Sequence, residues 1–365
     1  MHTPNPQQIS KKQPHLLQPN FVHVAGQYRV GKLLSSGGSG SVYLGKDIKT
    51  GADIALKIGH IGYLPSKLSH EHHVYENIAG STGISPIHWY SKEDIYEVIV
   101  MDYLGTLLGD MISMQQFDHR KTFRFASQML SAVKSLHTRH YIHHDIKPEN
   151  FIVQDDSSMV FLIDFGLVRL FREPATYLHI PYSTKHSAVG MLPFVSINGQ
   201  QGYAQSRRDD MESLVYTIIF LAHGNLPWIR LCSQSDEEGV LRKKLLITVE
   251  ELCKGLPAPF CKFINHVCSL GFDKKPDYQY LCSILLECSE QTETDQPSKP
   301  PRSACSPKRS PVHLDSTCRV LCSSTRTTRL IAQSEIDQPS KPLHSAHSPK
   351  HSPVRLDRHP GCIAL

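Results

Sequence analysis

One short segment of the chain carries side chains whose types and spacing suit a reaction on a phosphate-bearing ligand. Residues 143–150 read His-His-Asp-Ile-Lys-Pro-Glu-Asn, so a carboxylate, an ammonium group and an amide lie close together. Asp164, Phe165 and Gly166 follow soon afterwards. Carboxylate and amide oxygens are hard ligands of the kind that Mg²⁺ prefers, and a lysine can neutralise phosphate charge.

A second group of residues lies upstream, where short runs of alternating hydrophobicity predict β-strands. Residues 35–40 read Ser-Ser-Gly-Gly-Ser-Gly, and Lys57 ends the run Ile54-Ala55-Leu56-Lys57 on a predicted strand. Glu71 follows on a predicted helix. Glycine has no Cβ, so such a turn can bring backbone N–H groups close to phosphates. Either group alone could arise by chance, but their joint spacing disfavours reading them as ordinary core and loop residues.

These two groups together resemble the catalytic loop, the metal-binding triplet, the glycine-rich loop and the lysine–glutamate pair of protein kinases. Further segments resemble the casein kinase I family: His179-Ile180-Pro181-Tyr182, Ser196-Ile197-Asn198, residues 206–213 (Ser-Arg-Arg-Asp-Asp-Met-Glu-Ser), Leu226-Pro227-Trp228, Leu252-Cys253-Lys254-Gly255 and Lys275-Pro276-Asp277-Tyr278. In particular, Ser-Ile-Asn stands where most kinases have Ala-Pro-Glu. The resemblance runs from about Tyr28 to Glu287.

The resemblance implies a role for each matching position. Asp145 would accept the proton of the substrate hydroxyl, Lys147 would neutralise the γ-phosphate, and Asn150 and Asp164 would bind Mg²⁺. Lys57 would hold the ATP phosphates and Glu71 would orient that lysine. The remaining positions implied for ATP are Leu34, Gly37, Gly38, Gly40, Val42, Ala55, Met101 as gatekeeper, and the backbone of Asp102 and Leu104. Asp210 would brace the catalytic loop from a buried helix.

The chain departs from the family pattern at a few positions. Ser35 replaces the first glycine of the loop, and His144 replaces the arginine before the catalytic aspartate. Met191 stands in place of a threonine that contacts the catalytic aspartate and lysine, and Pro193 in place of an arginine that binds an anionic substrate group. We therefore expect a weaker preference for acidic substrates. The residues named as replacements for part of the missing charge are Arg207, Arg208, Lys243 and Lys244.

The order of the predicted elements indicates the fold class. Strand-like alternation appears at Tyr28–Leu33, Ser41–Leu44 and Asp53–Ile58. Helical periodicity follows, most clearly over 118–137, where apolar residues recur at helical spacing. We predict an α+β fold of two lobes, a small antiparallel β-sheet lobe with one main helix and a larger helical lobe, with ATP in the cleft.

Composition and charge divide the chain into a leader, a folded domain and a tail. Residues 1–27 are interrupted by prolines and read as a flexible leader, residues 28–289 form the predicted kinase domain, and residues 290–365 read as a disordered basic tail. The tail repeats itself, since 295–315 and 337–357 are closely similar. Residues 291–365 hold eleven Lys/Arg and six Asp/Glu, so the net charge of +5 falls in the tail.

The terminal Cys362-Ile363-Ala364-Leu365 fits a prenylation motif, and a basic tail would add attraction to anionic lipid. The alternative is a hydrophobic end that arises by chance. We expect a cytoplasmic protein, anchored at the cytoplasmic face of a membrane if Cys362 is lipidated. No apolar run reaches the length of a transmembrane helix. The chain has ten cysteines but no secretory signal, so we expect free thiols in a reducing compartment rather than disulfides. A neutral domain argues against nucleic-acid binding.

These observations predict a monomeric serine/threonine protein kinase that uses ATP and Mg²⁺ to phosphorylate protein hydroxyl groups in signalling. The alternative is a catalytically weak or inactive kinase-like scaffold that binds protein partners. The presence of all six residues Lys57, Glu71, Asp145, Lys147, Asn150 and Asp164 favours the enzyme, because a scaffold has no chemical need for them. A lipid or small-molecule kinase is disfavoured by the Ser-Ile-Asn and Ser-Arg-Arg-Asp-Asp segments.

Overall fold

The computed structural model describes residues 23–37, 40–60, 67–92, 96–113, 117–155, 157–187 and 189–294. The chain divides into two compact units. Of the described residues, the first unit takes those up to Leu68 together with Ile87–Tyr103, and the second takes Ser69–Pro86 and those from Leu104 to Thr294. The tail repeats and Cys362 lie outside the described residues, so the prenylation motif stays a prediction.

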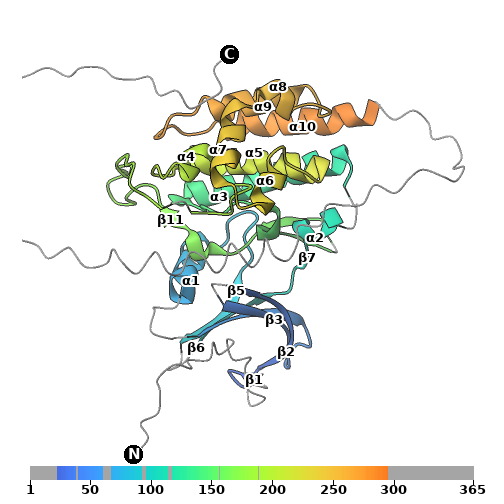
Figure 1. Ribbon diagram of the computed structural model, residues 1–365. Coiled ribbons are helices and arrows are strands. Elements are labelled where there is room, and N and C mark those ends of the chain that lie inside the picture. Colours follow the sequence, from blue (N-terminus) through green and yellow to red (C-terminus); the bar gives the residue numbers. More distant parts are fainter. Residues whose placement is uncertain are drawn as a thin grey trace, which may run out of the picture. The chain divides into compact units, whose positions relative to one another are not determined.

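The first unit is built on a six-stranded antiparallel sheet with the order β1-β2-β3-β4-β6-β5 (Figure 1). Its strands are β1 (His23–Val24), β2 (Tyr28–Gly37), β3 (Gly40–Asp47), β4 (Asp53–His60), β5 (Ile87–Lys92) and β6 (Tyr96–Asp102). Each of the three predicted strands is present and longer than expected. Strand β1 falls inside the segment expected to be a flexible leader, and it pairs with the start of β2.

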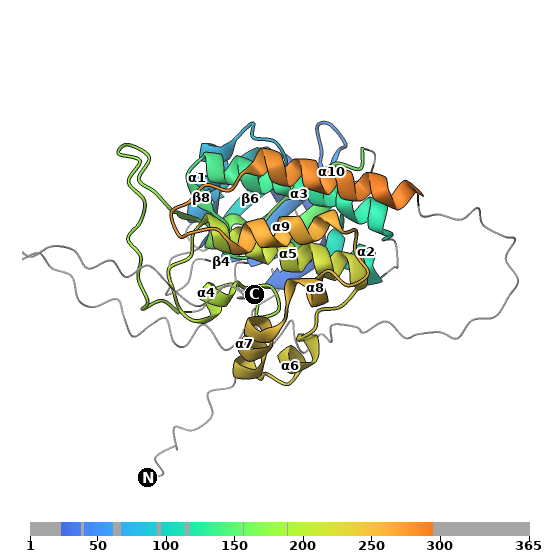
Figure 2. The ribbon, with the colours of Figure 1, turned by 90° about the horizontal axis from the view of Figure 1, so that it is seen from above.

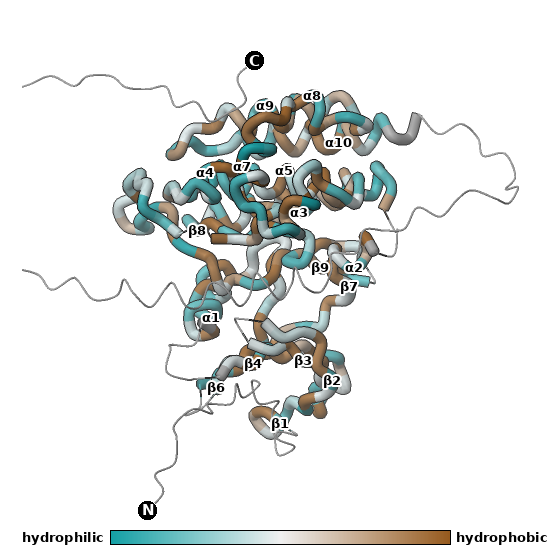
Figure 3. Tube along the Cα trace, viewed as in Figure 1, coloured by the Kyte–Doolittle hydropathy of each residue, from teal (hydrophilic) through white to brown (hydrophobic). Residues whose placement is uncertain are grey.

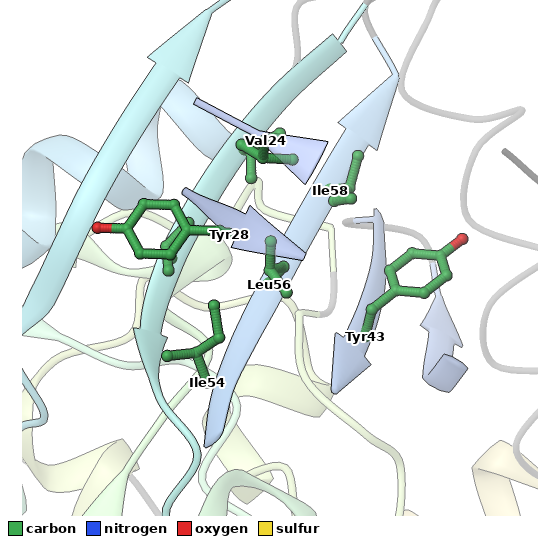
Figure 4. Packing of buried hydrophobic residues seen from close by; sticks show 8 residues of the cluster. Val24, Tyr28, Tyr43, Ile54, Leu56 and Ile58 are labelled. Atoms are coloured by element: carbon green, nitrogen blue, oxygen red, sulfur yellow. The ribbon is translucent and has the colours of Figure 1, made fainter. Parts of the chain in front are cut away.

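One face of this sheet forms a hydrophobic core, shown in Figure 4. Ile54, Leu56 and Ile58 alternate along β4 and point into it, because successive side chains of a strand face opposite sides. Val24 of β1 and Tyr28 of β2 contribute to the same cluster, which Trp89 covers in part. Because the core residues alternate along β4, the residues between them lie on the opposite face of the sheet.

The second unit is mainly helical. Its helices are α1 (Lys67–Ile78), α2 (Leu108–Ser113), α3 (His119–Thr138), α4 (Ile197–Gln200), α5 (Arg207–His223), α6 (Ile229–Ser233), α7 (Glu237–Leu246), α8 (Val249–Leu252), α9 (Pro259–Cys268) and α10 (Tyr278–Thr294). One short strand, β7 (Gly105–Leu107), precedes α2. The other short strands and the 3₁₀ turns lie between α3 and α4: β8 (Tyr141–Ile142), η1 (Pro148–Asn150), β9 (Phe151–Gln154), β10 (Val160–Leu162), η2 (Phe165–Leu167) and β11 (Arg169–Leu170).

Helix α3 lies at the centre of the helical unit, and it packs against α5 and α10 (Figure 2). Asp118 caps it by accepting a hydrogen bond from the Lys121 amide at 2.7 Å. The apolar stripe predicted for this segment is buried: Phe123, Ala126, Met129, Leu130, Val133 and Leu136. Hydrophobic residues also dominate α9 (brown in Figure 3), whose Phe260 and Phe263 are fully buried.

The observed architecture, an antiparallel sheet followed by a larger helical lobe, confirms the predicted fold class. Helix α10 continues to Thr294, a few residues past the predicted end of the domain. Within the described part of the chain, no helix has both the length and the apolar character needed to cross a bilayer.

Candidate active site

The face of the sheet opposite the core carries four of the predicted ATP residues. Ala55 and Lys57 alternate with the core residues of β4 and therefore share this face. Val42 of β3 is the register partner of Lys57, and Met101 of β6 is the register partner of Ala55. Residues far apart in sequence are thus adjacent because three neighbouring strands present them in register.

The glycine-rich turn joins β2 to β3. Gly37 and Gly40 are register partners at its two ends, while Gly38 lies outside the described residues. Gly40 has φ +129°, and a Cβ built on it would lie 2.5 Å from the Ile58 carbonyl oxygen. Only glycine fits this position without strain. Leu34, on β2, leaves 43% of its surface exposed.

Strand β6 ends at Met101, the predicted gatekeeper, and at Asp102, the first of the two predicted hinge residues. The Asp102 carboxylate lies 2.6 Å from Nε2 of His88 on β5, so its side chain is occupied within the sheet. Within the sheet, Asp102 is the register partner of Ile54 on β4. Leu104, the next predicted residue, is buried at the start of the second unit.

In the second unit, the loop between β8 and β9 gathers the predicted catalytic residues around Asp145. Lys147 Nζ donates to Asp145 Oδ2 at 2.5 Å. Asn150 Nδ2 donates to the Asp145 backbone oxygen at 2.7 Å and to Oδ2 at 3.2 Å, and the Met191 amide donates to Oδ1 at 3.0 Å. The carboxylate is therefore fixed from three sides.

This arrangement also sets the charge of Lys147. Burial lowers the pKa of its ammonium group, but the carboxylates of Asp145, Glu149 and Asp164 outweigh burial and raise the pKa overall. Lys147 thus remains a cation in a shielded position. Since Asn150 uses its amide nitrogen on Asp145, its amide oxygen is free of that contact and remains able to act as an acceptor.

The catalytic loop is held in place by Asp210, on the buried helix α5. Its Oδ2 accepts from the His143 amide at 2.6 Å and its Oδ1 from the His144 amide at 3.0 Å. Nε2 of His137 lies 2.9 Å from Oδ2, and the hydroxyl of Tyr278 lies 2.6 Å from Nδ1 of the same ring. Burial would raise the pKa of Asp210, yet the His137 hydrogen bond and charge lower it, so the carboxylate is ionised.

Asp164 follows β10 in a left-handed backbone conformation, φ +65°. Behind it the ring of Phe165 is fully buried and meets the edge of Tyr75 on α1, with centroids 4.7 Å apart. Glu71 is also buried on α1, one turn before Tyr75. The left-handed residue turns the chain sharply, so that Phe165 enters the core while Asp164 does not.

His144, the departure from the family's arginine, points its ring at the backbone. Its Nδ1 lies 3.0 Å from the Leu167 carbonyl oxygen. Burial lowers the pKa of the imidazole, against the opposing charge of Asp210. Where the family has a charged guanidinium, this chain therefore has a neutral imidazole that contacts the backbone after Asp164.

The segment 191–195 is anchored through its backbone. Lys244 Nζ donates to the carbonyl oxygens of Leu192 at 3.0 Å and Val195 at 2.7 Å, and the Trp228 indole donates to Pro193 O at 2.8 Å. One sequence expectation needs correction here. Lys244 is buried and bound to these carbonyls, so it cannot supply the anion-binding charge that Pro193 lacks.

Arg207 was also expected to supply part of the charge missing at Pro193, and this expectation too is wrong. It is buried, donates to the Asp273 backbone oxygen at 2.6 Å, and lies over the Phe171 ring. Arg208 contacts Asp209 at 3.6 Å, whereas Lys243 is exposed. Of the four residues named from the sequence, three therefore make internal contacts, and Lys243 is exposed.

The donor set of the second unit suits a divalent cation such as Mg²⁺. Asp164 and Asn150 both offer hard oxygen atoms. When bound, Mg²⁺ would neutralise phosphate charge. The Asp145 carboxylate lies beside the ammonium group of Lys147, which is a fixed cation.

The chain matches the protein kinase domain family over residues 28–288 and therefore belongs to that family. Its members transfer the γ-phosphate of ATP to proteins. The geometry around Asp145 agrees with this class of protein, because the carboxylate, the cation and the amide lie together as phosphoryl transfer requires.

Sequence reasoning missed His137, its contact with Tyr278 and the anchoring role of Lys244. His137 and Tyr278 are 141 residues apart, and the family-like segment that ends at Tyr278 does not indicate this contact. Lys244 belongs to a charged run that reads as a solvated helix face. Only the three-dimensional packing of α3, α5, α7 and α10 brings these residues to the site.

Proposed function

We propose that this protein is a serine/threonine protein kinase of casein kinase I type, which transfers the γ-phosphate of ATP to hydroxyl groups of protein substrates. The observation that carries the proposal is the cluster of Asp145, Lys147 and Asn150. A carboxylate held by three donors, beside a cation with a raised pKa, is suited to orient a hydroxyl and offset phosphate charge.

In this proposal Asp145 accepts the substrate proton and Lys147 stabilises the transferring phosphate. Asn150 and Asp164 are assigned to Mg²⁺, and Lys57 with the glycine turn to the ATP phosphates. The casein kinase I assignment is supported by the Ser-Ile-Asn segment, where Ser196 caps α4 and donates to the buried Asp209 at 2.8 Å. The alternative, a scaffold without activity, predicts no dependence on these side chains.

Replacing Asp145 by asparagine tests the proposal. We expect Asp145→Asn to lower the rate of ³²P transfer from Mg-ATP to casein by about 10²-fold or more, because the general base is lost. Asp273→Asn is a matched control, since that side chain is 63% exposed and its carboxylate lies 3.7 Å from the ammonium group of Lys274, whose side chain is 70% exposed. Equal transfer by the wild type and Asp145→Asn would favour the scaffold.

A further inference from the structure

Lys244 on α7 uses all three hydrogens of its ammonium group inside the helical unit. Its Nζ donates to Val195 O at 2.7 Å, to Leu192 O at 3.0 Å and to Gln200 Oε1 at 3.3 Å, so three N–H bonds meet three acceptors. The Gln200 Nε2 donates in turn to Glu237 O at 2.6 Å, which keeps the amide oxygen turned toward Lys244. Lys244 thus binds two carbonyls that lie 49 and 52 positions away in the sequence.

The segment 191–195 is closed on itself and is anchored a second time. The amides of Phe194 and Val195 both donate to Met191 O at 2.9 Å, so the segment forms a tight turn. The Trp228 indole, directly before α6, donates to Pro193 O at 2.8 Å. Hydrogen bonds within the turn keep its shape, while Lys244 and the indole fix its place. The backbone amide at the start of the turn therefore has little freedom to move.

This amide, that of Met191, contacts the carboxylate of Asp145. It donates to Oδ1 at 3.0 Å, whereas Lys147 and Asn150 both donate to Oδ2. In the part of the chain that the structure describes, Oδ1 is therefore held by the Met191 amide. A methionine side chain has no hydrogen to donate, so residue 191 can orient Asp145 only through its backbone.

We propose that Lys244 and Trp228 are positioning residues: they fix the turn 191–195, and the Met191 amide of that turn sets the orientation of the Asp145 carboxylate. The inference rests on the proposed kinase function for its effect on rate. Lys244 and Trp228 touch no reacting atom and act only through the backbone that they hold. Residues of the α6–α7 region thus help to orient the carboxylate that accepts the substrate proton.

Lys244→Met tests this role, because it removes the donors and keeps a long apolar side chain. We expect kcat to fall about tenfold, the factor expected for one lost hydrogen bond to a charged group. The KM for ATP should stay near that of the wild type, because neither Lys244 nor the turn is among the residues predicted to bind ATP.

Two controls accompany this variant. Lys243→Met changes the exposed neighbour on the same helix and should match the wild type. Ile264→Val changes a buried residue of α9, so it lowers stability without touching the turn and should keep the wild-type kcat. An unchanged kcat in folded Lys244→Met would overturn the proposal.

A double-mutant cycle with Asp145 separates positioning from a general structural role. If Lys244 acts through the Asp145 carboxylate, Lys244→Met should cost little more in a chain that already carries Asp145→Asn. Loss of stability alone would lower the rate by the same factor in both backgrounds. Trp228→Phe keeps an aromatic ring without the indole N–H and should follow the same pattern, so it decides the matter if Lys244→Met does not fold. Equal factors in the two backgrounds would overturn the proposal.

The Val195 carbonyl permits a measurement without ATP. Val195-Ser196 is the only Val-Ser pair in the sequence, so valine labelled with ¹³C at the carbonyl and serine labelled with ¹⁵N give a single NMR signal. Burial lowers the pKa of Lys244 to about 8, against the charges of Glu212 on α5 and Cys232 on α6. Because Lys244 donates to this carbonyl, the carbonyl shift should follow the charge of the ammonium group.

We expect the Val195 carbonyl shift to titrate near pH 8 in the wild type, in Lys243→Met and in Cys232→Ser, and not in folded Lys244→Met. A wild-type shift that stays constant between about pH 7 and about pH 10, where a buried lysine of this kind loses its proton, would refute the contact with Lys244. If the wild type transfers no phosphate but the carbonyl titrates as expected, the kinase proposal fails and the anchoring of the turn stands.

Discussion

Lys244 carries an ammonium group into the interior of the helical unit. The residue is 1% exposed, and its Nζ donates to two backbone carbonyls and to the Gln200 side chain at 3.3 Å. The rings of Tyr216 and Trp228 lie 5.3 and 5.4 Å from the same atom. Burial lowers the pKa of Lys244 to about 8, even though the Glu212 carboxylate opposes the shift.

This lowered pKa makes stability depend on pH. The unfolded chain, with a lysine pKa of 10.5, binds a proton between about pH 8 and 10.5 that the folded chain does not. The free energy of unfolding should therefore rise with pH across this window, by about 3 kcal/mol at most.

Urea unfolding at pH 8 and at pH 10 measures this rise. Lys244→Met should lack it, and Lys243→Met, with an exposed side chain, should keep it. If the free energy of unfolding changed equally with pH in the wild type and in Lys244→Met, the pH dependence could not be assigned to Lys244.

Substrate preference also depends on a single residue, because Pro193 stands where the family has the guanidinium of an arginine. Pro193 is buried and its carbonyl is bound by Trp228, while Lys244 and Arg207 are occupied internally. We expect little rate advantage for a peptide with a phosphoserine three residues before the target serine over its unphosphorylated twin. Kinetics on the two peptides measure it, and a large advantage for the phosphorylated one would show that another cation binds the phosphate. Pro193→Arg is the matching gain-of-charge variant and should increase the advantage.

The proximity of the candidate catalytic residues was predictable where a motif fixed their order. Asp145, Lys147 and Asn150 lie within one turn-rich segment, so local sequence dictated their proximity. The contact between His70 and Arg169 could not be predicted, because the two residues are 99 positions apart and each is of a type that is usually found on the surface. The same holds for the packing of Lys244 against Trp228.

At the scale of elements, hydrophobic periodicity predicted the helices and strands that bury one face. The stripe from Phe123 to Leu136 predicted α3, and the alternation of Ile54, Leu56 and Ile58 predicted β4. Strand ends were less predictable, because β2 and β3 continue into the glycine-rich turn, where the pairing of Gly37 with Gly40 replaces side-chain packing. The two-residue strand β1 is too short for any periodic signal.

The turn between β2 and β3 offers a test of backbone strain. In Gly40→Ala the new Cβ would meet the backbone oxygen of Ile58, so we expect a loss of stability of about 2 kcal/mol or more. Gly51 also has a positive φ, +76°, but a Cβ added there would meet no atom within 4 Å. Gly51→Ala should therefore cost only about 1 kcal/mol. Urea unfolding compares them, and equal losses would show that the close approach to Ile58 is relieved by a small shift.

At the scale of the whole molecule, the sequence predicted two lobes and their order. A sheet-forming start followed by helical periodicity was sufficient, because each pattern requires its own hydrophobic core. The start of the folded region was less clear, since prolines before residue 20 gave the first 27 residues a leader-like composition. Val24 is nevertheless 3% exposed within the core of the sheet.

Chains that begin at residue 23 and at residue 27 would locate this boundary. The longer chain keeps β1, whereas the shorter one removes Val24 from the core beside Tyr28. We expect the shorter chain to be less stable by about 1–2 kcal/mol, the value of one buried valine side chain. Thermal unfolding of the two chains provides the comparison, and equal midpoints would mean that β1 adds nothing to the fold.

The chain has two tryptophans, and they are divided between the two units. Trp89 is partly buried against the core of the sheet, and Trp228 is fully buried among the helices with its indole nitrogen bound to Pro193. Intrinsic fluorescence thus contains one emitter from each unit, in two different environments. With Trp89→Phe or Trp228→Phe, the remaining emission reports on a single unit, so melting of the sheet and of the helical lobe can be followed separately without an added label.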